Sequence, residues 1–287
     1  MKIKILGKPE EDKKPKIEIP DNFLGEPIEG AYEAFEKGRG EKSKGLVAKS
    51  EGVIGRLILN IKNPEDYIIL PGRTHQGQNG SYSYPDILVS VKRIPVKNNW
   101  YEIQEMLHKE GKQMLNIRQF VDFLNLVKSG NLYNAKGDRI DFELAQKLDK
   151  DLFKRNSPKT GELLDAFFIK EDEIQYDHRT SGKRLEATVS ERIENPMTRQ
   201  FAYSPMNSVS FDGWLKKANY QGLPTDLCGR GSLGYMRPEE GRVAFYSVDS
   251  NGFDLTCDLD PRGIRKNLSH AKTKFSVRPA ILAEAIK

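Results

Sequence analysis

The stretch VAFYSVDSNGFDLTC, residues 243–257, contains two alternating strands around an Asn251–Gly252 pair. Asn-Gly commonly closes a two-residue β-hairpin. Because side chains alternate along a strand, pairing outward from that turn gives one packing face, made of Tyr246, Val248, Leu255 and Cys257. The opposite face is polar and sets the carboxylates of Asp249 and Asp254 against each other, which costs about 0.2–1 kcal/mol. Such a face suggests side chains that serve something other than stability.

The composition is that of a folded, soluble protein. The chain has 287 residues, of which 37% are hydrophobic and 30% charged, so it is long enough to bury a substantial core. It has no apolar run of the roughly 20 residues that span a bilayer and no secretory signal, so we expect a cytoplasmic protein without membrane contact. The net charge of +5 is too small to predict nucleic-acid binding.

The amino-acid composition divides the chain into two segments. Residues 1–44 are rich in Lys, Glu, Gly and Pro, which predicts a flexible charged tail. Residues 45–287 form the predicted domain, with a helical part at about 98–156 and a strand-rich part at about 158–287. Near its start we expect strands at 52–62 and 84–94, joined by a Gly- and Ser-rich loop in which His75 is an exposed polar residue.

Three helices have recognisable ends. Trp100 opens one that finishes near Gly111. Asn116 caps a second, which Gly130 terminates, and Asp141 caps a third. A short fourth helix is predicted at 210–220. Helices followed by short strands indicate an α+β fold.

Chemical motifs are scarce. The chain lacks a phosphate-binding GxxxxGK[ST] loop, an HExxH zinc motif and a GxSxG elbow. Acidic residues gather late in the chain, and calcium is one use for such a cluster, although the EF-hand spacing is missing. The two cysteines, Cys228 and Cys257, are too few for a disulfide framework. We therefore predict no catalytic residue, no metal and no cofactor.

A family resemblance rests on GYMRPEEGRVAFYSVDSNGFDLTCDLDP, residues 234–261, followed by KFSVRPA, residues 274–280. This pattern resembles the end of a C-type-lectin-like domain of the formylglycine-generating-enzyme type. It is specifically similar to variable proteins that diversity-generating retroelements diversify. The resemblance implies a C-type-lectin-like fold in which helices lie against short, mostly antiparallel strands. Two departures are a Phe-Ser-Val-Arg strand in place of the usual Leu-Gly-Val-Arg, and an unusually basic loop at 262–274.

The resemblance also implies a ligand-binding face. Its changeable positions would be Phe245, Ser247, Asp249, Asn251, Asp254, Thr256, Asp258 and Asp260. Tyr235 and Trp214 are further candidates as apolar anchors, although either side chain suits a core equally well. We expect the unknown ligand to be a protein.

Two other functions remain open. One is an enzyme, either calcium-dependent or of the formylglycine-generating type, although Cys228 and Cys257 do not reproduce the copper-binding cysteine pair of that family. The other is a nucleic-acid-binding module, which would use the lysines of the tail and five C-terminal basic residues: Arg262, Arg265, Lys266, Lys272 and Lys274.

Overall fold

The chain divides into two units, Met1–Lys44 and Gly45–Lys287. The computed structural model describes parts of the second unit, namely residues 61, 63–78, 80–96, 98–155, 159–170, 173–181, 184–194, 207–225, 231–262 and 273–282. The predicted tail lies outside these residues, and so does the strand predicted at 52–62 apart from residue 61.

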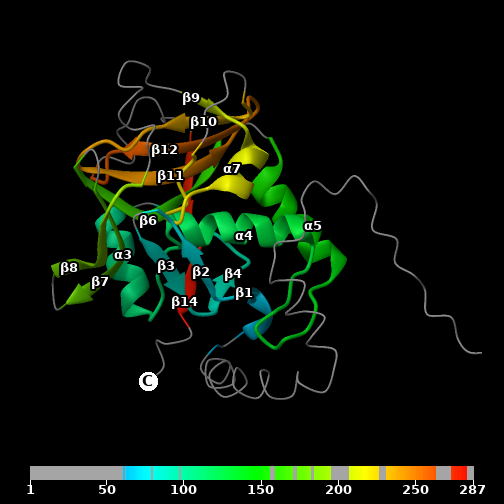
Figure 1. The fold of residues 1–287 in the computed structure, drawn as a ribbon. Coiled ribbons are helices and arrows are strands. Elements are labelled where there is room, and N and C mark those ends of the chain that lie inside the picture. Colours follow the sequence, from blue (N-terminus) through cyan, green and yellow to red (C-terminus); the bar gives the residue numbers. More distant parts are fainter. Residues whose placement is uncertain are drawn as a thin grey trace, which may run out of the picture. The chain divides into compact units, whose positions relative to one another are not determined.

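Among the described residues, the largest sheet has nine strands and contains the hairpin of the opening stretch (Figure 1). Its main order is β5 (Ile94–Pro95), β13 (Lys274–Val277), β6 (Thr160–Lys170), β11 (Arg242–Val248), β12 (Phe253–Leu259), β10 (Leu233–Met236) and β9 (Asn207–Val209). The remaining two strands, β7 (Glu173–Ser181) and β8 (Arg184–Arg192), extend from β6. All pairings are antiparallel except β10 with β12 and β13 with β6.

A smaller sheet and a ribbon complete the β structure. The sheet has the order β1 (Tyr67–Leu70), β4 (Ile87–Ser90) and β14 (Ala280–Leu282), and the ribbon pairs β2 (Arg73–Gln76) with β3 (Ser81–Tyr84). The prediction of a loop between two strands was wrong here, because the Gly- and Ser-rich segment forms the β2–β3 ribbon. Tyr82 and Tyr84 alternate with serines and are buried, so their rings hold the ribbon against the body of the domain.

The predicted helices are present: α3 (Trp100–Lys109), α4 (Ile117–Ser129), α5 (Phe142–Phe153) and α7 (Phe211–Lys217), together with the 3₁₀ turn η1 (Pro64–Asp66). The predicted ends of α3 and α4 and the cap of α5 are confirmed, whereas α7 ends at Lys217, before the predicted end at residue 220. The side chain of Asn116 accepts a hydrogen bond from the backbone N–H of Gln119, and Asp141 accepts one from Leu144. Gly130 ends α4 with φ of 68°, a conformation that favours glycine. The described residues therefore form an α+β fold.

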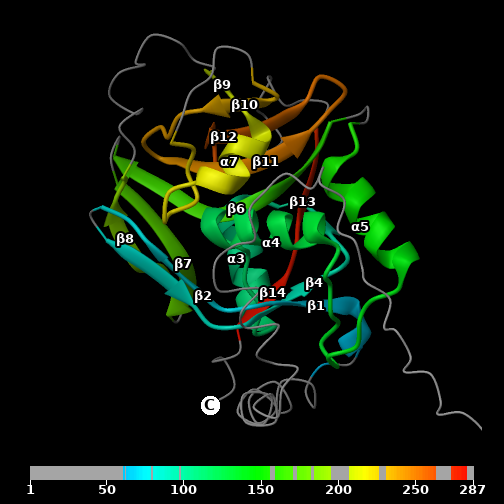
Figure 2. The same ribbon diagram turned by 45° about the vertical axis from the view of Figure 1, so that its right-hand side comes forward.

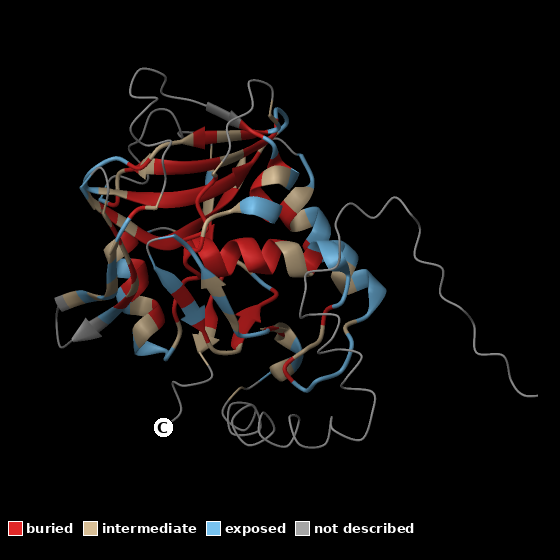
Figure 3. Cartoon of the chain, viewed as in Figure 1, coloured by how far each residue is buried: buried red, intermediate tan, exposed pale blue. Residues whose placement is uncertain are grey.

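Helix α4 is the centre of the packing. All of residues 117–124 are buried, because the helix lies between the large sheet and the β1–β4–β14 sheet (Figures 1 and 2). Burial extends from α4 into β6, β11 and β12 (Figure 3). On the opposite face of the large sheet, Trp100, Ile103 and Leu107 of α3 form a second apolar cluster with residues of β6, β11 and β13. The strands of the hairpin are thus covered on both faces.

No helix within the described ranges combines the length and apolar character needed to cross a membrane.

Candidate functional site

The connection between β11 and β12 differs from the predicted two-residue turn. Val248 pairs with Phe253, so four residues, Asp249 to Gly252, form the loop. Its conformation is set by Asp249, whose Oδ1 accepts hydrogen bonds from the backbone N–H groups of Asn251 at 2.7 Å and Gly252 at 3.1 Å. This side-chain turn competes successfully with the Asn-Gly turn.

The new register removes the predicted carboxylate pair. Asp254 lies opposite Ser247, and Phe245 lies opposite Thr256. Relative to the prediction, the pairings of Phe245 to Val248 move by two residues, and a shift of two preserves the face on which each side chain lies. Beyond an irregularity between Val243 and Phe245, Val243 pairs with Leu259. The predicted packing face is therefore confirmed: the four residues assigned to it are buried in the main core, Tyr246, Val248, Leu255 and Cys257.

The prediction for the opposite face of the hairpin was wrong. Phe245, Ser247 and Thr256 were expected to be displayed, but at most 1% of each residue is exposed. Phe245 joins the α3 cluster, which covers this side of the sheet. Its ring also explains Gly161 on β6, because a Cβ there would lie 2.4 Å from Phe245 Cζ.

Both proposed apolar anchors belong to the core. Trp214 and Tyr235 are each 1% exposed and lie in the main apolar cluster. The indole Nε1–H of Trp214 donates a hydrogen bond to the carbonyl oxygen of Gly222 at 2.8 Å. The one polar group of this side chain is therefore satisfied within the core. Neither ring is available for a partner in this structure.

Five of the predicted site residues retain some exposure. Asn251 is exposed at the hairpin tip beside a half-buried Asp249. Asp254 is half-buried and forms an ion pair with Lys159 at 2.5 Å. Asp258 and Asp260 lie at the other end of β12, where the chain leaves the sheet. The candidate surface therefore has two parts, a tip and an acidic end.

The negative charges at the acidic end are only partly balanced by nearby basic side chains. Arg242 Nε lies 3.6 Å from Glu239 Oε2, and Arg242 Nη1 lies 4.0 Å from Asp260 Oδ2. Asp258 Oδ1 is buried and has no hydrogen-bond donor among the described residues. The pKa of Asp258 is raised, first by burial and then by the nearby negative charge of Glu239. This carboxylate would gain from a positively charged neighbour.

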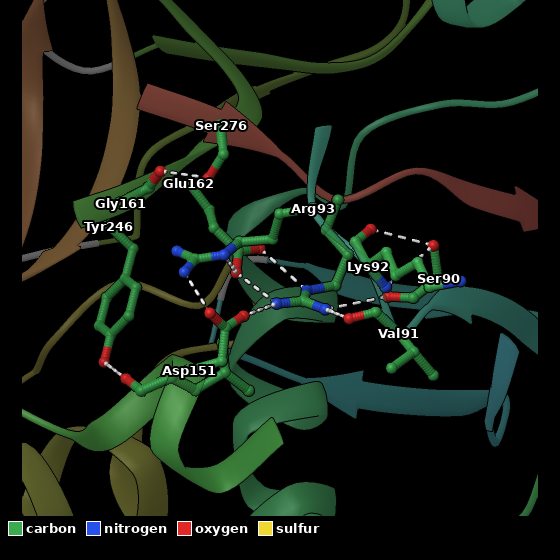
Figure 4. A network of polar contacts seen from close by, with 11 residues as sticks. Ser90, Val91, Lys92, Arg93, Asp151, Gly161, Glu162, Tyr246 and Ser276 are labelled. Atoms are coloured by element: carbon green, nitrogen blue, oxygen red, sulfur yellow. Dashed lines mark hydrogen bonds and ion pairs between the residues drawn. The ribbon is translucent and has the colours of Figure 1, made fainter. Parts of the chain in front are cut away.

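A buried ion-pair network holds the hairpin from beneath. Arg278 is 2% exposed, and its Nη2 lies 2.7 Å from Glu162 Oε1 and 2.8 Å from Asp151 Oδ2. Its Nη1 donates to the carbonyl oxygens of Ser90 and Val91. Figure 4 shows Arg93 beside the same carboxylates and Tyr246 reaching from β11 toward α5. The network links β4, β6, α5 and the end of β13, so it makes the support of the hairpin rigid.

Cys257 has the properties of a core residue. It is a buried free cysteine, and burial raises its pKa well above the ordinary value of a thiol. A reactive cysteine needs thiolate character and access. Cys228 lies outside the described residues. Within those residues, no group of three or more His, Cys, Asp or Glu side chains is arranged to hold a metal ion.

A second polar region escaped the sequence analysis. Asp165 on β6 is fully buried and accepts from the His178 ring at 2.6 Å, from the His178 backbone N–H at 3.0 Å and from Gln104 at 2.6 Å. Nearby, Asp177 on β7 accepts from the hydroxyl of Tyr82. Asp177 has φ of 55°, unusual for a residue other than glycine, and burial raises its pKa to about 7. Asp177 and His178 are neighbours on β7, but Asp165, Gln104 and Tyr82 come from β6, α3 and β3, so no local spacing in the sequence indicates this cluster.

The structure also corrects the prediction for His75, which was expected to be an exposed polar residue. Its ring Nε2 lies 2.7 Å from Asp122 Oδ2 on α4, and only 20% of the side chain is exposed.

Comparison of the chain with protein-family models, with curated proteins and with solved structures gives no significant match.

Proposed function

We propose that this chain is a non-catalytic ligand-binding protein that presents the exposed parts of its β11–β12 hairpin to a protein partner. In this proposal the domain is a C-type-lectin-like scaffold and its C-terminal surface is diversified by a retroelement. The recognition residues are now restricted to Asp249, Asn251, Asp254, Asp258 and Asp260.

The observation that carries the proposal is the state of Asp258. Its carboxylate is half-buried, and one of its oxygens has no donor among the described residues. Burial and the charge of Glu239 raise its pKa, and the charges of Arg242 and Lys159 offset this only in part. Folding alone does not reward such an arrangement. A Lys or Arg side chain of a partner would supply both the missing donor and the missing charge.

Rigidity supports the same conclusion. The hairpin is anchored by two apolar clusters and by the Arg278 network, so its exposed carboxylates are held on a fixed frame. A recognition surface on rigid strands loses less conformational entropy on binding than one on a loose loop. The burial of Cys257 favours binding over cysteine-based catalysis.

Selection from a displayed random-peptide library tests the binding function. The full chain serves as bait, beside D258N/D260N and the control D138N/E143Q, which changes two exposed acidic residues elsewhere. We expect enrichment of Lys- and Arg-containing peptides on the wild type and the control, and its loss on D258N/D260N. Equal enrichment on all three baits, or none on any, would refute the proposed surface.

Sequencing of the surrounding DNA tests diversification separately. We expect a reverse-transcriptase gene and a second copy of the codons for residues 243–278 that differs chiefly at adenines. Absence of that copy would remove diversification from the proposal and leave binding to the peptide experiment.

A further inference from the structure

A cluster of cationic side chains surrounds one buried carboxylate beneath the β2–β3 ribbon. Asp122, in the middle of α4, is 1% exposed. Its carboxylate accepts from Tyr84 Oη at 2.6 Å, lies 2.7 Å from His75 Nε2 and is paired with Arg118 Nη2 at 2.7 Å. Arg73 Nη1 lies 3.7 Å from the same carboxylate. Ribbon and helix each contribute cationic groups to the cluster.

The charges in this cluster do not balance. Arg73 and Arg118 form their described ion pairs with Asp122 alone, so one negative charge faces two guanidinium groups as well as an imidazole. Burial by itself would raise the pKa of Asp122, but the hydrogen bond from His75 and the charge of Arg118 lower it below its ordinary value. The carboxylate is therefore ionised at neutral pH, and the cluster still has a net positive charge.

One donor in the cluster has no acceptor within the described part of the chain. The Arg118 side chain is 6% exposed, and its Nη1 donates to the carbonyl oxygens of Ala218 and Asn219. Its Nε–H is buried without a hydrogen-bond partner among the described residues. Guanidinium groups usually satisfy their N–H donors when buried, because an unpaired donor of a charged group is costly. An acceptor with a negative charge would form the missing hydrogen bond to this Nε–H and would also balance the excess positive charge.

The cluster is within reach of solvent. The side chains of Arg73 and His75 are 23% and 20% exposed, and both come from β2. Strands β2 and β3 pair only with each other among the described strands.

We propose that Arg73, His75 and Arg118 form a binding site for a small oxyanion group, a carboxylate or a phosphate, with Asp122 as the residue that positions them. The guanidinium fork matches the oxygens of either group, and charge-assisted hydrogen bonds to it are strong. This site belongs to α4 and the ribbon, so it is separate from the hairpin surface proposed above.

Thermal unfolding of the full chain tests the site. Wild type, R73Q and the control R242Q, whose arginine is also partly exposed, are compared in sodium phosphate, sodium acetate and sodium chloride at equal ionic strength and pH. We expect saturable stabilisation by phosphate or acetate beyond that of chloride in the wild type and R242Q. In R73Q the apparent affinity should fall by about tenfold, the loss typical of one charge-assisted hydrogen bond.

Stabilisation by phosphate alone assigns the site to phosphate groups, and stabilisation by acetate alone assigns it to carboxylates. An equal response of R73Q and the wild type would overturn the proposal, as would no oxyanion effect beyond that of chloride. NMR titration of the wild-type arginine Nε–H resonances gives an independent test should R73Q fail to fold. We expect the Arg118 signal to move as the anion saturates the site, and an unmoved signal contradicts the proposal.

Discussion

Replacement of Asp177 by Asn should stabilise the protein, and the gain should depend on pH. The Asp177 carboxylate accepts from Tyr82 Oη at 3.3 Å and from Asn116 Nδ2 at 3.4 Å, distances that indicate weak hydrogen bonds. Its pKa is raised from 3.8 to about 7, first by burial and then by the charge of Asp165. Asparagine keeps an acceptor oxygen, tolerates the positive φ of 55° and does not ionise.

The magnitude follows from linkage. The folded state holds the Asp177 proton more tightly than the unfolded chain, so this residue reduces stability as the pH rises from about 4 to about 7, and the cost is complete above pH 7. One pKa unit corresponds to about 1.4 kcal/mol, so ionisation of Asp177 costs up to about 4 kcal/mol. D177N should therefore raise the free energy of unfolding by about 2–4 kcal/mol at pH 8 and change it little at pH 4.

Urea denaturation at pH 4, 6 and 8 measures this difference. The exposed Asp138 provides the control, since D138N should leave the free energy of unfolding unchanged at all three values. The reasoning is refuted if D177N has the same effect at pH 4 and pH 8, or if it destabilises the protein at pH 8.

Substitutions at three further sites, the Arg278–Glu162 pair, Gly161 and Ser247, test the support of the hairpin by urea denaturation at pH 7. R278M should lower the free energy of unfolding by about 3–5 kcal/mol, because the buried Glu162 loses its nearest ion-pair partner and keeps only Arg93 at 3.9 Å. The double variant R278M/E162L should recover part of that loss, and a loss below about 1 kcal/mol for R278M would contradict a buried network. G161A should cost at least about 1–3 kcal/mol through overlap with Phe245 and the Tyr246 carbonyl, and a neutral effect would contradict this contact. S247A should stabilise the protein by about 1 kcal/mol, because Ser247 Oγ is buried and has no hydrogen-bond partner among the described residues. A clear destabilisation would contradict this reasoning.

Local features of the fold were predictable from the sequence. The cap at Asn116, the left-handed end at Gly130 and the cap at Asp141 each depend on residues no more than a few positions apart. The packing face of the hairpin was also predictable, since side chains alternate with a period of two whatever the register. The two-residue shift at Asp249 therefore left the faces unchanged while it removed the predicted carboxylate pair.

The candidate site was only partly predictable. Alternation separates the two faces of a strand, but it does not reveal what lies over each face. Phe245 and Ser247 were assigned to a displayed face on that basis, and the α3 cluster on this side of the sheet accounts for the burial of Phe245. Asp258 is only partly exposed, and its Oδ1 has no hydrogen-bond donor among the described residues, a property that sequence spacing does not specify.

What the sequence determined by itself was the set of helix ends, the α+β class and the inner face of the hairpin, because these follow from caps and periodicity within short stretches. Only the tertiary structure decided which polar groups meet. Arg278 binds the carbonyl oxygen of Ser90 across 188 residues, and His75 meets Asp122 across 47. Such contacts arise when separate elements pack together, so no local pattern records them, and both proposed sites depend on contacts of this kind.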